Sequence, residues 1–223
     1  MDHPIQLLTG KSKSKKASKL NSIATDSYRA LKINIEFKAI GKDIKTLVIT
    51  SSMRGEGKTI TSLNLAIAYA QSGKKVLLID ADLRKPGVHL LFEGDYGRGL
   101  THFLINESTL SETIQKTNIP DLSVITSGST PSNPSELLTS PQMDILINEV
   151  KQNYDIILID TPPILGFIET KMLAAKCCGV VFVVEHGIVK KSVASKAKDE
   201  ILSVKANLLG VVMNKMKKKE ASI

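Results

Sequence analysis

The sequence predicts a single α/β domain built on a doubly wound, mostly parallel sheet with helices on both faces. The chain has 223 residues without an obvious break in composition, a length that suits one sizeable core. Short apolar segments alternate with segments of helical periodicity, as expected of βαβ units. The apolar segments are hydrophobic throughout, which is typical of parallel strands covered on both faces.

The predicted elements begin with a helix over residues 22–38, SIATDSYRALKINIEFK. Its apolar residues recur at helical spacing behind a start rich in Ser, Thr and Asp. Six strands follow, with helical patterns between them. The strands are TLVITS at 46–51, VLLID at 76–80, LSVIT at 122–126, DIILID at 155–160, GVVFVVE at 179–185 and LLGVVMN at 208–214.

Basic residues gather at the two ends of the chain. Of the net charge of +8, residues 1–20 carry +4 and residues 215–223 carry +3, so residues 21–214 are nearly neutral. We predict a basic, disordered N-terminal segment, a folded domain over residues 21–214 and a basic C-terminal tail. Basic ends can solubilise a chain or meet an anionic membrane surface. The nearly neutral body, without Trp and with few aromatic residues, argues against nucleic-acid binding.

The segment SSMRGEGKT at 51–59 has the features of a phosphate-binding loop between a strand and a helix. A full Walker A pattern is G-x-x-x-x-G-K-[ST], and Ser52 stands in place of its first glycine. Gly55 and Gly57 let backbone N–H groups turn toward phosphate oxygens, and the following helix directs its positive end at the same anion. A flexible glycine-rich turn is the alternative. The strand before the segment and the helix after it favour phosphate binding.

Lys58 is expected to reach the β and γ phosphates of ATP, facing solvent rather than the core, and the Thr59 hydroxyl to bind Mg²⁺. The predicted nucleotide-binding residues of the segment are Gly55, Glu56, Gly57, Lys58, Thr59 and Ile60.

Three carboxylates end two further strands. VLLIDADLRKP places Asp80 and Asp82 at the end of one strand, and DIILIDTPP places Asp160 at the end of another. Ligands of open α/β sheets bind at the carboxyl ends of the strands, so we expect all three beside the phosphate loop. Asp80 and Asp82 are two residues apart and so point to the same face of an extended chain, where both can bind one magnesium ion. Each Asp alone could be a helix cap or a turn residue, but three beside GKT are better explained as a Mg·ATP site.

SSMRGEGKT, LLIDADLRKP and ILIDTPP, in this order and spacing, resemble the Walker A, A′ and B motifs of the bacterial tyrosine kinases of capsule and exopolysaccharide operons. The form they resemble is the separate cytoplasmic kinase of Gram-positive bacteria. The resemblance covers about residues 22–214, and DADLRKP is its most specific part. It implies a P-loop NTPase-like fold and an autophosphorylating protein tyrosine kinase that uses Mg·ATP.

The resemblance also implies a cellular context. The substrates would be protein tyrosines, and the activity would control polysaccharide polymerisation or export. A membrane-spanning modulator protein would activate the kinase and hold this cytoplasmic chain at the inner face of the plasma membrane.

The same resemblance implies roles for single residues. Asp80 is similar to the carboxylate thought to deprotonate the tyrosine hydroxyl, with a metal role as the alternative. Arg84 would lie near the transferring phosphate or pair with a carboxylate. Asn214 matches a position that meets the adenine base in related ATPases, although an Asn that closes a strand is also common in turns. Glu169 keeps a carboxylate where relatives carry Asp. The implied phosphate and metal residues are Lys58, Thr59, Asp82 and Asp160.

DSYRALK at 26–32 resembles the E-x-x-R-x-x-R motif that packs against the neighbouring subunit in a ring of these kinases. Arg29 is retained, while Asp26 and Lys32 replace the Glu and the second Arg. The resemblance implies a homo-oligomer, with the three residues forming one polar stripe on a helix. A solvated helix face is the alternative.

Two departures leave other interpretations open. The family usually ends in a tyrosine cluster, whereas this sequence ends NKMKKKEASI, and its tyrosines are scattered. Either a cluster lies beyond this sequence, or the chain phosphorylates other proteins, or the activity has been lost. The rival class is a partitioning or division-site ATPase that uses ATP to switch dimerisation. Those proteins carry K-G-G-x-G-K-T, and Met53 stands where their additional Lys would be, which favours the kinase. A non-catalytic nucleotide-binding regulator is the third interpretation.

Overall fold

The computed structural model of the chain describes residues 6–7, 15–93 and 97–216. Among these residues, seven strands form one sheet in the order β5-β6-β3-β7-β2-β8-β9, parallel except for the antiparallel edge strand β5. All six predicted strands are confirmed, and β5 was not predicted. The strands are β2 (Thr46–Ser51), β3 (Val76–Asp80), β5 (Gln115–Lys116), β6 (Leu122–Ile125), β7 (Ile156–Asp160), β8 (Gly179–Glu185) and β9 (Leu208–Asn214).

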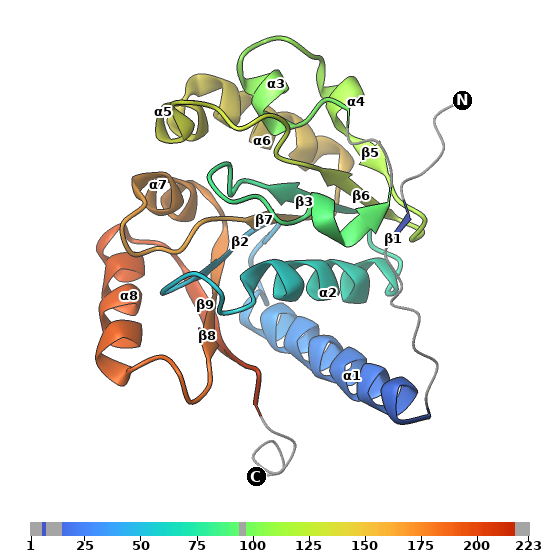
Figure 1. Ribbon diagram of the computed structural model, residues 1–223, viewed down its shortest axis with the longest axis vertical. Helices are drawn as coiled ribbons and strands as arrows, with labels where there is room; N and C mark the ends of the chain where they lie inside the picture. The colour runs from blue at the N-terminus through green and yellow to red at the C-terminus, as the bar shows by residue number, and fades with distance from the viewer. Residues whose placement is uncertain (1–5, 8–14, 94–96, 217–223) are drawn as a thin grey trace.

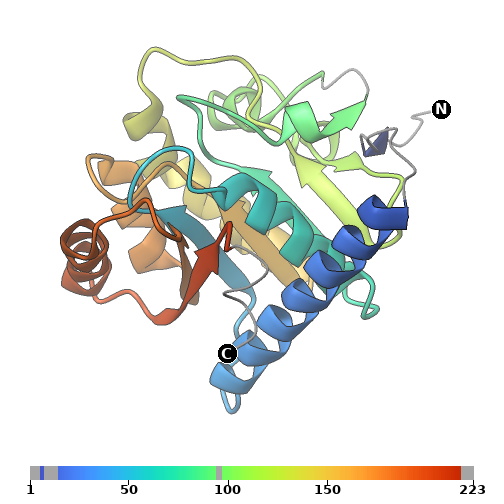
Figure 2. The same ribbon diagram turned by 60° about the horizontal axis from the view of Figure 1, so that its bottom comes forward.

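Helices cover both faces of the sheet, which confirms the predicted doubly wound α/β class (Figure 1). On one face, α1 (Lys15–Lys38) packs across α2 (Lys58–Ala70), as Figure 2 shows. The opposite face carries α3 (Leu100–Leu104), α5 (Pro134–Thr139), α6 (Pro141–Asn153), α7 (Ile168–Lys176) and α8 (Lys191–Ser203). Smaller elements are the turn η1 (His89–Leu91), α4 (Leu110–Thr113) and a two-stranded pair of β1 (Gln6–Leu7) with β4 (Phe92–Glu93).

The strands are buried on both faces because each sends apolar side chains to two separate cores. In β2, Leu47 and Ile49 belong to the core beneath α1 and α2, whereas Val48 belongs to the core beneath α6, α7 and α8. Successive residues of a strand point to opposite faces, so a strand between two helical layers must be apolar at every position. This explains the continuous apolar runs of the sequence.

The N-terminal helix begins earlier than predicted. α1 starts at Lys15, so residues 15–20 are helical and their predicted disorder is wrong. Lys, Ala and Leu in this stretch are good helix formers, and they extend the predicted helix backwards. Residues 1–5 and 8–14 lie outside the described residues, as do residues 217–223 of the predicted tail. No helix in the described part of the chain is both long and apolar enough to cross a membrane.

Candidate active site

The phosphate loop joins β2 to α2, and two glycines set its shape. Gly55 and Gly57 have φ of +88° and +90°, in the left-handed region that favours glycine. A Cβ on Gly57 would overlap the side-chain amide of Asn214, whereas a Cβ on Gly55 would meet nothing within 4 Å. Gly57 also precedes the first residue of α2, Lys58. Gly57 therefore serves both the turn and the close approach of β9 to the loop.

Glu56 holds the loop from inside. Its side chain is buried and accepts hydrogen bonds from Ser52 Oγ at 2.6 Å, from the Met53 backbone N–H and from the Glu185 backbone N–H at 3.2 Å. These contacts tie the loop to the end of β8. Glu56 was predicted to bind nucleotide, but its carboxylate is occupied by the loop and by the end of β8.

The end of β9 supports the same loop. Asn214 Nδ2 donates to the Glu56 carbonyl at 2.8 Å, and Lys215 Nζ donates to the Gly55 carbonyl at 2.8 Å. Lys215 also pairs with Glu185 at 2.8 Å. Asn214 is therefore a structural neighbour of the loop, while its contact with an adenine base stays a prediction. Ile60, also predicted to bind nucleotide, is exposed on the first turn of α2.

The predicted carboxylates lie beside the loop. Lys58 Nζ is 2.8 Å from Asp82 Oδ2, and the Thr59 hydroxyl donates to Asp160 Oδ2 at 2.6 Å. The Ser62 hydroxyl donates to the other Asp160 oxygen at 3.2 Å. The side chains of Lys58 and Asp82 are only 12% and 3% exposed, so the expectation that Lys58 faces solvent is wrong.

Asp80 shapes the turn that follows β3. It is fully buried, and its carboxylate accepts backbone N–H groups from Asp82 at 3.1 Å, Gly87 at 3.0 Å and Val88 at 2.9 Å. In the parallel pairing of β3 with β7, Asp80 lies directly beside Asp160. The structure thus places Asp80 within the site, but with its oxygens engaged by the backbone.

Burial and mutual repulsion make the carboxylates hard to ionise. Burial, together with the charge of Asp160, raises the pKa of Asp80 to about 7. Burial also raises the pKa of Asp160 to about 6, although Lys58 acts in the opposite direction. Burial lowers the pKa of Lys58, but Asp160 and Asp82 outweigh it and hold that pKa above its ordinary value. One ammonium thus faces three carboxylates, an excess of negative charge that suits a divalent cation.

The donor set fits Mg²⁺. Thr59, Asp82 and Asp160 offer hard oxygen atoms close to one another. Within the described residues, no group of three His, Cys, Asp or Glu side chains is arranged to hold a metal ion alone. Magnesium in phosphoryl-transfer sites keeps several waters and uses one or two carboxylates together with substrate phosphates, so a complete protein cage is not required.

Arg84 pairs with a carboxylate, one of its two predicted roles. Its Nε donates to Glu169 at 2.8 Å and a terminal nitrogen donates to Ser135 Oγ at 2.9 Å. Glu169 is buried, and Ser135 donates to its second oxygen at 2.8 Å. The guanidinium also lies 5.4 Å from the Phe167 ring centre, with Arg54 of the phosphate loop 5.6 Å from the same ring. The contact of Arg54 with Phe167 was not predictable from the sequence, because a separation of over a hundred residues gives no local pattern.

The helix residues predicted to form one polar stripe separate into two groups. Asp26 and Arg29 form an exposed pair at 3.3 Å. Lys32 instead pairs with Glu36 at 3.4 Å and lies 5.8 Å from the centre of the Tyr69 ring. Arg29 is thus the cation of this segment that faces outward.

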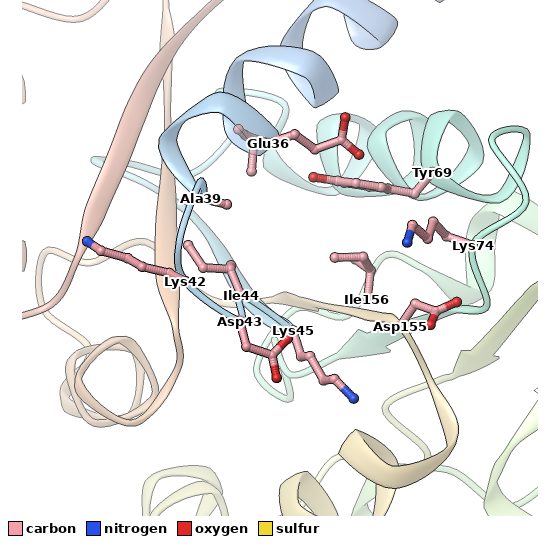
Figure 3. A pocket seen from close by; sticks show the side chains of 11 residues that line it. Glu36, Ala39, Lys42, Asp43, Ile44, Lys45, Tyr69, Lys74, Asp155 and Ile156 are labelled. Atoms are coloured by element: carbon pink, nitrogen blue, oxygen red, sulfur yellow. The ribbon is translucent and has the colours of Figure 1, made fainter.

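A cavity of about 240 Å³ at the opposite end of the sheet is a poor candidate site (Figure 3). It lies at the amino-terminal ends of β2 and β7, with Ile44, Tyr69, Lys74 and Asp155 among its lining residues. None of the predicted site residues lines it. Ligands of open α/β sheets bind at the carboxyl ends of the strands, which favours the phosphate-loop end.

Comparisons with known proteins agree with this geometry. Residues 44–214 match the AAA_31 family, described as an AAA domain. The chain is 44% identical over 193 residues to the tyrosine-protein kinase YwqD of Bacillus subtilis, covering 86% of this chain and 81% of that protein. It is 39% identical over 198 residues to the putative tyrosine-protein kinase CapB of Staphylococcus aureus, covering 89% and 87% of the two chains.

Solved structures show the same relationship. The chimerical protein CapA2B2 superposes with a TM-score of 0.83 at 36% identity, over 96% of this chain and 94% of that one. The kinase domain of the Escherichia coli tyrosine kinase ETK gives a TM-score of 0.81 at 30% identity, over 87% and 78%. The cell division ATPase MinD of Pyrococcus furiosus, at 23% identity and a TM-score of 0.64 over 76% and 71%, shares the fold alone. Sequence, fold and relatives together place the chain in the bacterial tyrosine-kinase family, on a P-loop fold.

Proposed function

We propose that this chain transfers the γ-phosphoryl group of Mg·ATP to tyrosine hydroxyls, including its own, in the control of capsular or exopolysaccharide synthesis. The observation that carries the proposal is the convergence of the phosphate loop with Lys58, Thr59, Asp82 and Asp160 at the carboxyl ends of three strands. The tyrosine kinases named among its relatives support the choice of acceptor.

Different residues of the site have different roles in phosphoryl transfer. The loop backbone and Lys58 hold the β and γ phosphates, and Thr59, Asp82 and Asp160 hold magnesium, which when bound neutralises charge on the phosphates. The phenol oxygen forms its bond to the γ-phosphorus as the bond to the bridging oxygen of ADP breaks. Asp80, whose pKa is raised to about 7 by burial and Asp160, is the proposed acceptor of the phenol proton. Because it is fully buried and accepts the Gly87 and Val88 N–H groups, this role requires the turn after β3 to move and uncover it.

The proposal includes two kinds of partner. A membrane-spanning modulator activates the kinase through its cytoplasmic segment and keeps it at the inner face of the plasma membrane. The chain forms a homo-oligomeric ring through residues 26–32. The exposed Arg29 supports the second proposal, because its guanidinium, paired only with the exposed Asp26, can also contact a neighbouring subunit.

Labelled ATP distinguishes the three interpretations of the family resemblance. The purified chain is incubated with Mg·ATP, the modulator segment and a tyrosine-containing acceptor, and the products are analysed for phosphotyrosine and for free phosphate. A kinase gives labelled tyrosine, a dimerisation switch gives phosphate alone, and a regulator gives neither. Asp82→Ala and Asp160→Ala each raise the magnesium concentration needed for activity. Unchanged magnesium titrations for both would remove these residues from the metal site.

A further inference from the structure

Arg54, in the middle of the phosphate loop, carries a positive charge that no carboxylate of the described residues neutralises. Its side chain is exposed, and no hydrogen bond or ion pair joins it to another residue in the described part of the chain. The other arginines each pair with a carboxylate, as Arg29–Asp26, Arg84–Glu169 and Arg98–Glu112. A guanidinium stays protonated in proteins, so Arg54 gives the loop a permanent cation with unused donors.

An aromatic ring, and not an anion, holds the Arg54 side chain. Its guanidinium carbon lies 5.6 Å from the centre of the Phe167 ring. The guanidinium of Arg84 lies 5.4 Å from the same centre, and buried Glu169 pairs with it at 2.8 Å. The face of an aromatic ring attracts a cation without neutralising it. The charge of Arg54 thus remains available to an anionic ligand.

The Phe167 ring joins the segments that carry the site. Arg54 belongs to the phosphate loop, Arg84 to the turn that follows β3, and Phe167 to the segment between β7 and α7. The same loop, the same turn and the end of β7 supply the lysine and the carboxylates of the site. The unpaired guanidinium therefore lies at the end of the sheet where the phosphates and magnesium are expected to bind.

The sheet order indicates which phosphate Arg54 would meet. In the order β3-β7-β2-β8-β9 the loop follows β2, with the magnesium carboxylates on the β3 and β7 side and Asn214 on the β9 side. Magnesium in phosphoryl-transfer sites bridges the β and γ phosphates, so the terminal phosphate belongs on the side of these carboxylates. Phe167 and Arg84 come from that side too. Their ring contact thus draws Arg54 toward the terminal phosphate and away from the nucleoside.

We propose that Arg54 binds the γ-phosphate of ATP and stabilises the charge that develops on it during transfer, with Phe167 as the positioning residue for its guanidinium. The inference rests on the proposed function and adds a second cation to Lys58 at the terminal phosphate. The charge of the transferring phosphoryl group is spread over its oxygens, and a planar guanidinium can donate to two of them at once. ADP lacks this phosphate, so Arg54 should distinguish ATP from ADP.

Calorimetry with two nucleotides tests the assignment without requiring catalysis. The whole chain is titrated with Mg·ADP and with Mg·AMP-PNP, an ATP analogue that keeps the γ-phosphate but resists transfer. Arg54→Met removes the charge and keeps a long apolar stem, Arg54→Lys keeps a cation without the planar fork, and Phe167→Leu removes the ring. Arg98→Met is the matched control for loss of an arginine charge, because Arg98 contacts Glu107 and Glu112 instead of the site.

Only the nucleotide with a γ-phosphate should respond to these changes. Arg54→Met should weaken Mg·AMP-PNP binding about tenfold, the effect of one charge-assisted hydrogen bond, and Mg·ADP binding by less than about twofold. Arg54→Lys and Phe167→Leu should each weaken binding of the analogue about threefold. Arg98→Met should change neither affinity. Equal losses for the two nucleotides in Arg54→Met, or no loss for the analogue, would overturn the assignment.

Phosphotyrosine formation tests the proposed function separately. A chain that binds the analogue through Arg54 but labels no tyrosine would refute the proposed transfer and leave the γ-phosphate contact standing. Where transfer occurs, Arg54→Met should lower its rate at saturating ATP by about a thousandfold, as expected for an arginine that meets the transferring group. An unchanged rate would remove Arg54 from the transition state. Failure of the wild type to bind either nucleotide would refute both proposals.

Discussion

Lys58→Met is expected to destabilise the fold as well as abolish phosphoryl transfer. Lys58 Nζ lies 2.8 Å from Asp82 Oδ2, and both side chains are almost fully enclosed. The same ammonium also holds down the pKa of Asp160. The substitution therefore leaves buried negative charge without its cation.

The size of the effect follows from this burial. Removing one partner of a buried ion pair costs about 3–5 kcal/mol, and the partial exposure of Lys58 points to the lower end, about 3 kcal/mol. In a chain of 150–250 residues, 1 kcal/mol lowers the Tm by about 2–4 °C, so we expect a loss of about 6–12 °C. Adding Asp82→Asn should recover part of that loss without restoring activity, because the carboxylate nearest to the lost ammonium is then neutral while Asp160 stays uncompensated.

Thermal and urea denaturation at pH 8 in EDTA measure this prediction. Lys176→Met is the matched control, since Lys176 pairs with Asp144 at 2.6 Å with both side chains more exposed, 28% and 47%. Breaking that pair should cost less than about 1 kcal/mol. Equal Tm values for Lys58→Met and Lys176→Met, or a double variant less stable than Lys58→Met alone, would refute the reasoning.

Three further outcomes are expected. Burial and Asp160 raise the pKa of Asp80 to about 7, and burial raises that of Asp160 to about 6, so the metal-free folded chain binds more protons than the unfolded chain between about pH 4 and pH 7. Its free energy of unfolding should therefore fall as pH rises through this window. Urea titrations in EDTA measure this dependence on pH, which should be weaker in Asp160→Asn. The same dependence in the variant and the wild type would contradict the raised pKa of Asp160. Gly57→Ala should weaken ADP binding more than tenfold and Gly55→Ala less, because a Cβ on Gly57 alone meets Asn214; equal losses by calorimetry would count against this. The isolated chain should be a poor kinase that the cytoplasmic segment of its modulator activates. ATP affinity and phosphotyrosine formation are measured with and without that segment. Full activity without the segment would contradict the modulator proposal.

The sequence predicted the sheet well because its signal is local. A strand covered on both faces must be apolar at every position, so β2 and β8 are visible as uninterrupted runs. β5 has two residues and β4 two, too short for any periodicity to appear. The start of α1 was misplaced because a run of lysines suits both a disordered tail and a helix.

The site was predictable where it follows from strand ends and not where it depends on distant pairing. Asp82 follows the end of β3 and Asp160 ends the neighbouring β7, so their approach to Lys58 follows from the parallel topology. The link of Glu56 to β8 could not be foreseen, because its partner Glu185 is 129 residues away, whereas its partners Ser52 and Met53 are local. Arg84 left two interpretations open because it lies in the turn after β3, while its partner Glu169 is 85 residues away on α7.

The support of the phosphate loop by Asn214 and Lys215 has a consequence for the newly made protein. The loop is translated early, at residues 51–59, but the groups that hold its carbonyls arrive with the last described strand. A chain still attached to the ribosome, which is made from its N-terminus at about 5–20 residues per second, passes through many intermediate lengths without β9. Until that strand joins the sheet, the glycines of the loop have nothing from β9 to fix their conformation. Competence to bind nucleotide should therefore be acquired only after β9 has been made and has joined the sheet.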